Sequence, residues 1–145
     1  MTKTKAQQIM AATEVRAAND VTAAIQDIAA EFEPYIIKQR RHFHKHPELS
    51  LAEERTTSDI ANQLDAMNIP YERPLKTGLV ATLRGTAPDA YREDGTPRRR
   101  ILLRADIDAL PVTEQTGEEF ASVNEGCMHA CGHDCHIAMM LGALQ

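Results

Sequence analysis

Apolar residues in the first third of the chain recur at a period of three to four. The repeating positions are Val21, Ile25, Ile28, Phe32, Ile36 and Phe43. This period places the side chains along one face of an amphipathic helix. Asn19 or Asp20 is suited to cap the start of that helix, and Pro47 marks its end. Pro34 lies inside the pattern, so it predicts either a bend or the first turn of a second segment.

The helix pattern divides the chain into two unequal parts. Residues 1–19 are expected to form a flexible or frayed N-terminal segment, and residues 20–145 to form a single domain. A chain of 145 residues with 43% hydrophobic residues is long enough to bury a core of its own.

Beyond Pro47 the pattern changes twice. Residues 53–67 have a second helical period, with Asn68 as its expected stop. Residues 71–83 are rich in strand-forming side chains, and residues 85–97 hold prolines, glycines and charges. We therefore expect a helix, then a strand, then an exposed loop.

The run Ile101-Leu102-Leu103-Arg104-Ala105-Asp106-Ile107-Asp108 is apolar until it ends in two acids. Such a run predicts a buried strand that delivers carboxylates at its C-terminal end, the edge where α/β sheets place their chemistry. Residues 112–125 read as a polar loop, and an apolar helix is expected to begin at about His136.

Charge and targeting signals exclude several classes of partner. The net charge of −5 and the pI near 5.6 disfavour nucleic acid and polybasic membrane contacts. The N-terminus lacks the apolar core of a signal peptide, and no stretch approaches the length of a membrane span. The three cysteines all lie between Cys127 and Cys135, which fits thiolate chemistry in the reducing cytoplasm better than a disulfide framework.

The segment Gly126-Cys127-Met128-His129-Ala130-Cys131-Gly132-His133-Asp134-Cys135-His136 is dense in metal-ligand side chains. Thiolate and neutral imidazole suit zinc and its first-row neighbours. Gly132 gives the backbone the freedom to turn, so that Cys131 and His133 can reach one small volume. Taken singly, a buried cysteine is usually a small hydrophobe and a histidine is usually a satisfied core or surface residue.

Two other interpretations of the cysteines stay open. Cys127, Cys131 and Cys135 are spaced four apart and would share one face of a helix, which suggests a three-cysteine cluster, although Gly132 weakens a helix there. A redox pair is the other, but the two-residue gap of the common dithiol motif is absent.

The acid pair and an upstream histidine triplet are weaker signals. Asp106 and Asp108 alternate along the expected strand, so only one should face a site, and a surface turn would also explain both. His42, His44 and His46 are two apart on a helix, so they point to different faces and should not form one ligand set.

Three motifs resemble those of the M20 family of metallo-amidohydrolases, in the branch of N-acyl-amino-acid amidohydrolases, hippurate hydrolases and auxin-conjugate hydrolases. They are RRHFHKHPELSLAEERTTSDIANQL, RADIDALPVTEQTG and MHACGHDCHIAMMLGAL, in that order. The resemblance implies an α/β, zinc-aminopeptidase-like catalytic domain, a mixed sheet flanked by helices. It also implies a lid domain that this chain lacks. His44 and Pro47-Glu48 lie in the first motif, where we expect structural packing near the edge of the site.

The resemblance also implies a site for two divalent metal ions, zinc or manganese, with cobalt or nickel possible. Cys131 and His133 match the first two ligands. Asp108 matches the aspartate that, in related branches, orients a metal-binding histidine. In this chain Asp106 occupies the position of that histidine. The remaining ligands and the glutamate that acts as general base are expected beyond Gln145. The residues expected to support the site or touch substrate are Asp106, His129, Asp134 and His136.

The implied activity is hydrolysis of the amide bond of N-acyl amino acids, small-molecule substrates, by an enzyme that dimerises through its lid. The chain is then an N-terminal fragment of such an enzyme, with residues 20–145 as the N-terminal portion of its catalytic domain. It is expected to be inactive alone and, with its strand edges unpaired, marginally stable. The alternative is a small non-catalytic Cys/His module that binds zinc only to hold its fold together.

Overall fold

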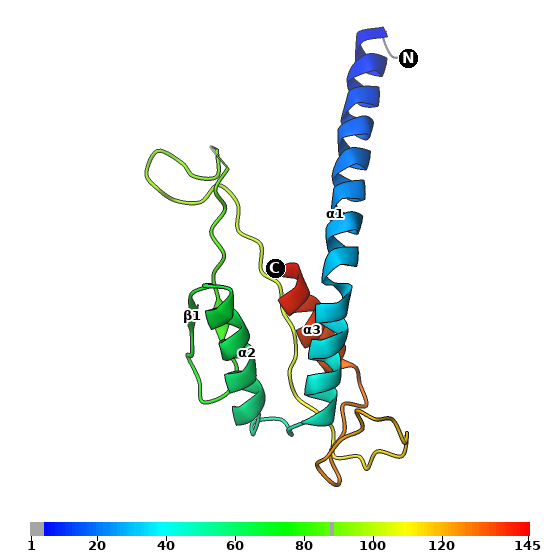
Figure 1. The fold of residues 1–145 in the computed structure, drawn as a ribbon. Coiled ribbons are helices and arrows are strands. Elements are labelled where there is room, and N and C mark those ends of the chain that lie inside the picture. The colour runs from blue at the N-terminus through cyan, green and yellow to red at the C-terminus, as the bar shows by residue number, and fades with distance from the viewer. Residues whose placement is uncertain (1–4, 88) are drawn as a thin grey trace.

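The computed structural model describes residues 5–87 and 89–145 of the chain, with three helices and two short strands. In chain order they are α1 (Lys5–Lys45), α2 (Glu54–Ala66), β1 (Tyr71–Glu72), β2 (Val80–Ala81) and α3 (His133–Ala143). Helix α1 is far longer than the rest, and its N-terminal half projects beyond the other elements (Figure 1). The folded body gathers around its C-terminal half.

Helix α1 runs without a break through the positions predicted to cap or divide it. Asn19 and Asp20 lie inside the helix, so the predicted cap there is wrong. The residues upstream are rich in alanine and glutamine, good helix formers that let the helix continue in that direction. Pro34 also lies inside α1 rather than starting a second segment, and the helix ends just before Pro47 as predicted. Residues 1–4 of the predicted flexible segment lie outside the described residues.

The core forms where α1, α2 and α3 meet. Its buried apolar residues are Phe43, Ile60, Leu64, Ile69, Ile137 and Leu141. Helix α3 lies beside the C-terminal half of α1 (Figure 1). The two helices lie close together at Gly142, where a Cβ atom would lie 2.6 Å from Cγ1 of Ile36. A larger residue at position 142 would therefore force the Ile36 side chain to move.

The second predicted helix is confirmed as α2, together with its stop. Asn68 has a φ of 57°, the left-handed conformation that ends a helix. Its N–H donates to the carbonyl of Asp65 at 3.0 Å, and the N–H of Ile69 donates to the carbonyl of Leu64 at 2.9 Å. These two bonds form a Schellman motif that satisfies the last carbonyls of α2.

The strand expected over residues 71–83 is reduced to a pair of two-residue strands. Tyr71 pairs with Ala81 and Glu72 with Val80 in antiparallel register. The stretch over residues 85–97 forms no helix and no strand where it is described, as predicted, and holds one isolated bridge between Tyr91 and Pro97.

The prediction of a buried strand over residues 101–108 is wrong for this structure. The segment is extended but unpaired, and Ile101 is 85% exposed and Leu102 89% exposed. A buried strand needs neighbouring strands and helices on both faces, and the described residues supply none. Only the residues just after it make isolated bridges, Leu49 with Ala109 and Leu110 with Met128.

Helix α3 begins three residues earlier than predicted, at His133, and packs against α1. Beyond its polar first turn it is apolar, and Ile137, Ala138 and Leu141 are buried. None of the described helices is both long and apolar enough to cross a membrane.

Truncation of Leu64 to alanine tests the three-helix core. Leu64 is 1% exposed, so L64A should lower the free energy of unfolding by about 2–5 kcal/mol. Leu102 is 89% exposed, so the matched variant L102A should change it by no more than about 0.5 kcal/mol. Urea denaturation followed by far-UV circular dichroism measures both, and equal effects would contradict the described core.

Candidate metal centre

The Cys/His-rich segment leads directly into the first turn of α3. Gly132 has a φ of 100°, a conformation that side chains rarely adopt, and it turns the chain into the helix. His133 and His136 follow at a spacing of three, which puts them on one face of that turn. Cys131 lies just before the turn and is exposed.

The proposed three-cysteine face does not form. Cys127 and Cys131 precede α3, and only Cys135 belongs to it, so the three side chains do not share one helix face. All three are free thiols, and burial raises the pKa of Cys127. The density of cysteines therefore reflects neither a helical cluster nor a disulfide.

Asp108 holds the ring of His133. The Nδ1 atom of His133 lies 2.9 Å from the carbonyl oxygen of Asp108 and 3.0 Å from its carboxylate Oδ1. Because both oxygens can only accept, Nδ1 carries the hydrogen and donates to them. The Nε2 atom then keeps its lone pair, the arrangement that metal-ligating histidines show when an outer carboxylate orients them.

Asp106 also lies near His133, so the prediction that only one of the two acids faces the site is wrong. Outside a regular strand, strict alternation of side chains is not imposed on the segment. Donor atoms of Asp106, His133 and His136 all lie within 4.8 Å of one another. Arg104 donates to Oδ1 of Asp106 from Nε at 2.9 Å and from Nη2 at 2.6 Å, and these bonds lower the pKa of Asp106. Cys131 is not part of this group of three.

A buried polar network lies behind the centre, on the side of α1. His44 faces Oδ2 of Asp134 through Nδ1 at 2.8 Å and Oε1 of Glu114 through Nε2 at 3.1 Å. The Nε atom of Arg40 reaches the same oxygen of Asp134 at 2.9 Å. The side chains of His44, Asp134 and Glu114 are each at most 5% exposed. The network joins the end of α1, the start of α3 and the polar loop.

The histidine triplet divides among separate partners, as its helical spacing predicted. His42 lies 2.8 Å from Oδ2 of Asp59 through Nε2, while His44 belongs to the buried network. His46 has a buried Nδ1 atom with no hydrogen-bond partner among the described residues, and burial lowers its pKa.

Glu48 is structural, as expected from its motif. Its Oε2 atom accepts from the backbone N–H of Thr56 at 2.7 Å and from the Thr56 hydroxyl at 2.8 Å. These bonds fall in the first turn of α2, where backbone N–H groups lack partners within the helix. Pro47 is buried, and its carbonyl accepts from Nδ2 of Asn124 at 2.7 Å.

Arg40 and Glu114 are site residues that the sequence did not reveal. Glu114 sits in a loop whose composition indicated a solvated surface, and no spacing links it to His44. Burial alone would raise the pKa of Glu114, but hydrogen bonds from the Ser122 N–H, the Thr116 hydroxyl and His44 hold it at about 2. Glu114 is therefore a buried carboxylate that fastens the loop to the network.

His129 is buried beside this network without satisfied hydrogen bonds. It is 4% exposed, and neither of its ring nitrogens has a partner within the described part of the chain. Burial lowers the pKa of His129, which keeps the ring neutral at neutral pH. Oδ1 of Asp134 is likewise buried and unpartnered.

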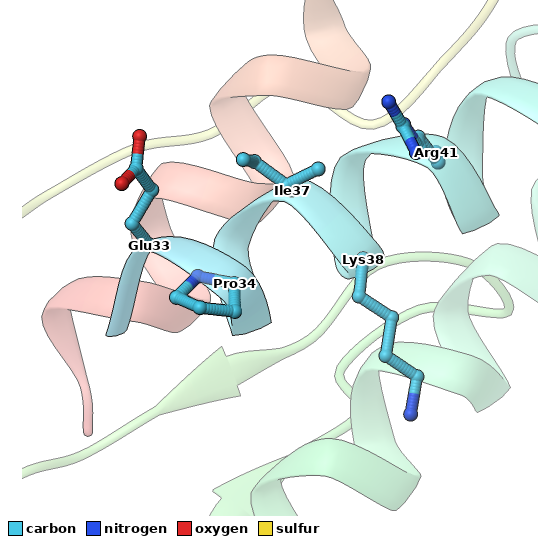
Figure 2. Close-up of a pocket in the computed structure, with 5 residues that line it drawn as sticks. All are labelled: Glu33, Pro34, Ile37, Lys38 and Arg41. Atoms are coloured by element: carbon cyan, nitrogen blue, oxygen red, sulfur yellow. The ribbon is translucent and has the colours of Figure 1, made fainter. Parts of the chain in front are cut away.

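A surface hollow lies away from the centre, along α1. Its volume is about 580 Å³, and its lining residues are Glu33, Pro34, Ile37, Lys38 and Arg41. Figure 2 shows these side chains fanning out from one helix rather than converging on a point. The lining includes neither histidine nor cysteine, so the centre and the hollow are unrelated.

The variant E114Q tests the electrostatic role of Glu114. The pKa of Glu114 is lowered from 4.5 to about 2, so its carboxylate stabilises the fold above about pH 4.5 and this contribution is lost as the pH falls to about 2. E114Q should lower the free energy of unfolding at pH 7 by about 1.5–3 kcal/mol. It should also flatten the pH dependence of that free energy across the same acidic range. Urea denaturation at several pH values measures this, with the exposed E125Q as control, and an unchanged acid dependence would contradict the assignment.

Comparison with known proteins places this geometry in a family. Residues 102–145 match the family model of peptidase family M20/M25/M40. An N-acyl-L-amino acid amidohydrolase from Geobacillus stearothermophilus is 43% identical over 119 residues, which cover 81% of this chain and 30% of the relative. An uncharacterized hydrolase from Staphylococcus epidermidis is 44% identical over 107 residues, which cover 74% of this chain and 25% of the relative.

A solved structure supports the same relationship. The Bacillus subtilis protein described as a dinuclear metal-binding peptidase of the M20 family superposes with a TM-score of 0.69 at 43% identity, covering 79% of this chain and 31% of that one. The predicted fold class is thereby confirmed, as part of an α/β catalytic domain. The chain spans between a quarter and a third of the length of these relatives. Residues 102–145 thus match the model of peptidase family M20/M25/M40, and the chain is similar in sequence and fold to these relatives over about four fifths of its length.

Proposed function

We propose that the protein carrying these residues is a metal-dependent amidohydrolase that cleaves the amide bond of N-acyl amino acids. The observation that carries the proposal is the bond between Asp108 and His133, which leaves Nε2 of the imidazole free for a metal. The named activity of the Geobacillus relative supports the substrate class. The dinuclear character of the Bacillus structure supports two metal ions.

In this proposal Cys131 and His133 are metal ligands and Asp108 is a positioning residue. The donors suit zinc or manganese, with cobalt or nickel as substitutes. Divalent ions bound there would polarise the amide carbonyl and lower the pKa of a water. The network of Arg40, His44 and Asp134 fixes the backbone beside His133, so the imidazole meets its partners with little reorganisation.

The finer surroundings of the activity are also proposals. The free cysteines suit the cytoplasm, and the acidic charge suits a small-molecule substrate rather than a nucleic acid. The family resemblance assigns the general base to a glutamate outside these 145 residues, and dimerisation to a lid domain. We therefore expect the isolated chain to bind metal without turning over substrate.

The alternative, a purely structural zinc module, finds less support in the geometry. A structural site is closed and four-coordinate. The group found among the described residues has three members, and His136 is exposed. If the alternative held, a chelator would unfold the chain, whereas an open catalytic-type centre would lose metal with little change in far-UV signal.

The deciding experiment is made on the native product of this gene. Antibodies against the chain would capture that product, its intact mass would be measured, and hydrolysis of N-acetyl amino acids would be assayed with added zinc or manganese. We expect hydrolysis that a chelator abolishes. A product that cleaves only unacylated peptides would contradict the substrate class, and one that is active without metal would contradict the mechanism.

The mass separates two further outcomes. The chain has a mass of 16.1 kDa. A product of this size with metal-dependent amidase activity would overturn our expectation that these residues alone are inactive. A product several times larger would place the activity in a longer protein.

The variant D108N tests the positioning role of Asp108. Loss of an outer partner typically weakens metal binding by 10–100-fold, and D108N should weaken zinc affinity within about that range. Competition with a chromophoric chelator measures the affinity, and far-UV circular dichroism should be unchanged. The control is D20N, the same substitution at an exposed position of α1. Equal affinities for D108N and the unchanged chain would remove Asp108 from the centre.

A further inference from the structure

The projecting part of α1 carries an apolar stripe that no other described element covers. Val21, Ile25 and Ile28 are 59%, 60% and 54% exposed, and every residue from 20 to 31 is exposed. This part of the helix extends beyond the folded body (Figure 1). Single exposed apolar side chains are ordinary, but a continuous row on one helix face marks a contact surface.

A helix in this position lacks the usual source of helical stability. Most helices in proteins are stabilised by the packing of an apolar face against a neighbour, and short isolated helices are marginal in water. The alanines between Val21 and Glu31 favour a helix by their propensity, but they bury little surface. A second helix against the stripe would supply the missing burial.

The stripe has the spacing of a coiled-coil seam. Its residues are Val21, Ile25, Ile28 and Phe32, which follow one another at intervals of four, three and four. These intervals are the alternation of a and d positions in a heptad. Phe32 is half-buried, so the seam begins beside the folded body and continues outward along the exposed helix.

The positions beside the seam allow a second helix to approach closely. In the heptad that the seam defines, the flanking e and g positions are Thr22, Ala24, Ala29 and Glu31. The two alanines leave room for the other backbone, and Glu31 is the one charged residue of the four. These positions usually set partner choice through charge, so their composition does not call for a partner of opposite charge.

The seam also reads the same in both directions along the helix. A twofold contact uses the same patch on both copies, so that each pairing occurs twice. In an antiparallel pair, Val21 would lie against Phe32 of the second copy. Ile25 would lie against Ile28 of the second copy in the same way. Every layer would then have a similar volume, whereas a parallel pair would set Phe32 against Phe32 and Val21 against Val21.

We propose that the stripe binds a second copy of this chain, through an antiparallel twofold contact between the exposed parts of α1. The antiparallel direction places the two folded bodies at opposite ends of the helix pair, so they do not collide. It also places Glu31 beside Ala24 of the second copy rather than beside another carboxylate. The inference does not rest on the proposed function, which assigns dimerisation to a lid domain outside these residues.

The charge of the helix determines the conditions under which the dimer is stable. From Asp20 to Glu33 the sequence has four acidic residues and neither lysine nor arginine. Two copies therefore repel each other over this stretch, and dissolved salt screens that repulsion. Dimerisation should become tighter as salt is added, because the attraction comes from apolar contact and the charges oppose it.

Sedimentation equilibrium of the 145-residue chain, over a range of chain concentrations and at two salt concentrations, tests the inference. A reductant is present because the three cysteines are free. The variant I25E places a carboxylate in the seam. The controls are A23E, which adds the same charge on the opposite face of α1, and L102E, at an 89% exposed position of the unpaired segment. Far-UV circular dichroism of each variant checks that the helices are kept.

We expect a monomer–dimer equilibrium that salt shifts toward the dimer. I25E should weaken dimerisation at least about tenfold, because each dimer would bury two unpaired carboxylates. A23E and L102E should leave the dissociation constant unchanged.

Three results would each overturn the inference. The first is a chain that stays monomeric up to millimolar concentration. The second is a dimer that L102E weakens and I25E does not, which would place the contact on residues 101–103. The third is a dimer that salt weakens, which would rest on ion pairs.

A double-mutant cycle tests the antiparallel direction separately. V21F alone and F32V alone should each weaken the dimer, because one overfills and the other empties a layer. A chain with both changes again has one phenylalanine and one valine in each antiparallel layer, so it should dimerise more tightly than the two single effects predict. Additive effects would exclude the antiparallel contact.

Discussion

The buried carboxylate of Asp134 is the interaction on which the arrangement of this chain depends. Its Oδ2 atom receives Arg40 at 2.9 Å and His44 at 2.8 Å, while the residue itself is 1% exposed. Removal of either partner would leave the buried carboxylate with only the other one, and poorly compensated charge is costly inside a protein. The start of α3 is thus fixed against the end of α1, and His44 extends the connection to Glu114 in the loop. His133 directly precedes Asp134 in α3, so its backbone is held in place by the same contacts.

What could be predicted from the sequence depended on whether the signal was local. Helix α2 and its stop at Asn68 were predictable because a helical period and a left-handed residue act within a few positions. The crowding of donor side chains near His133 was visible in one short segment, but Cys131, the predicted partner of His133, lies outside the group that the structure brings together. The network partner Glu114 was not, because it lies 70 positions from His44 and carries no pattern of its own. Long-range pairing of this kind is decided by tertiary packing.

The segment at residues 101–108 also shows that a local pattern does not determine long-range pairing. Its apolar character fits a strand, yet the side chains at its start are largely exposed because nothing described here pairs with them. The relatives are three to four times longer than the part this chain spans. In a protein of that length, neighbouring strands would cover such a segment. The hydrophobic pattern shows that residues 101–108 could form a strand, but whether the strand forms depends on neighbouring strands to pair with it.

The first turn of α3 also constrains which changes in chain length the site can survive. His133, Asp134 and His136 face three different partners within four consecutive positions. Because a helix rotates by about 100° per residue, one inserted or deleted residue here would redirect every later side chain. The loop over residues 112–125 is attached at separate points, by Glu114, Phe120 and Asn124, so a change of length between those points disturbs the rest of the fold less. Insertions and deletions among related sequences should therefore fall in the loop over residues 112–125 and be absent from the first turn of α3.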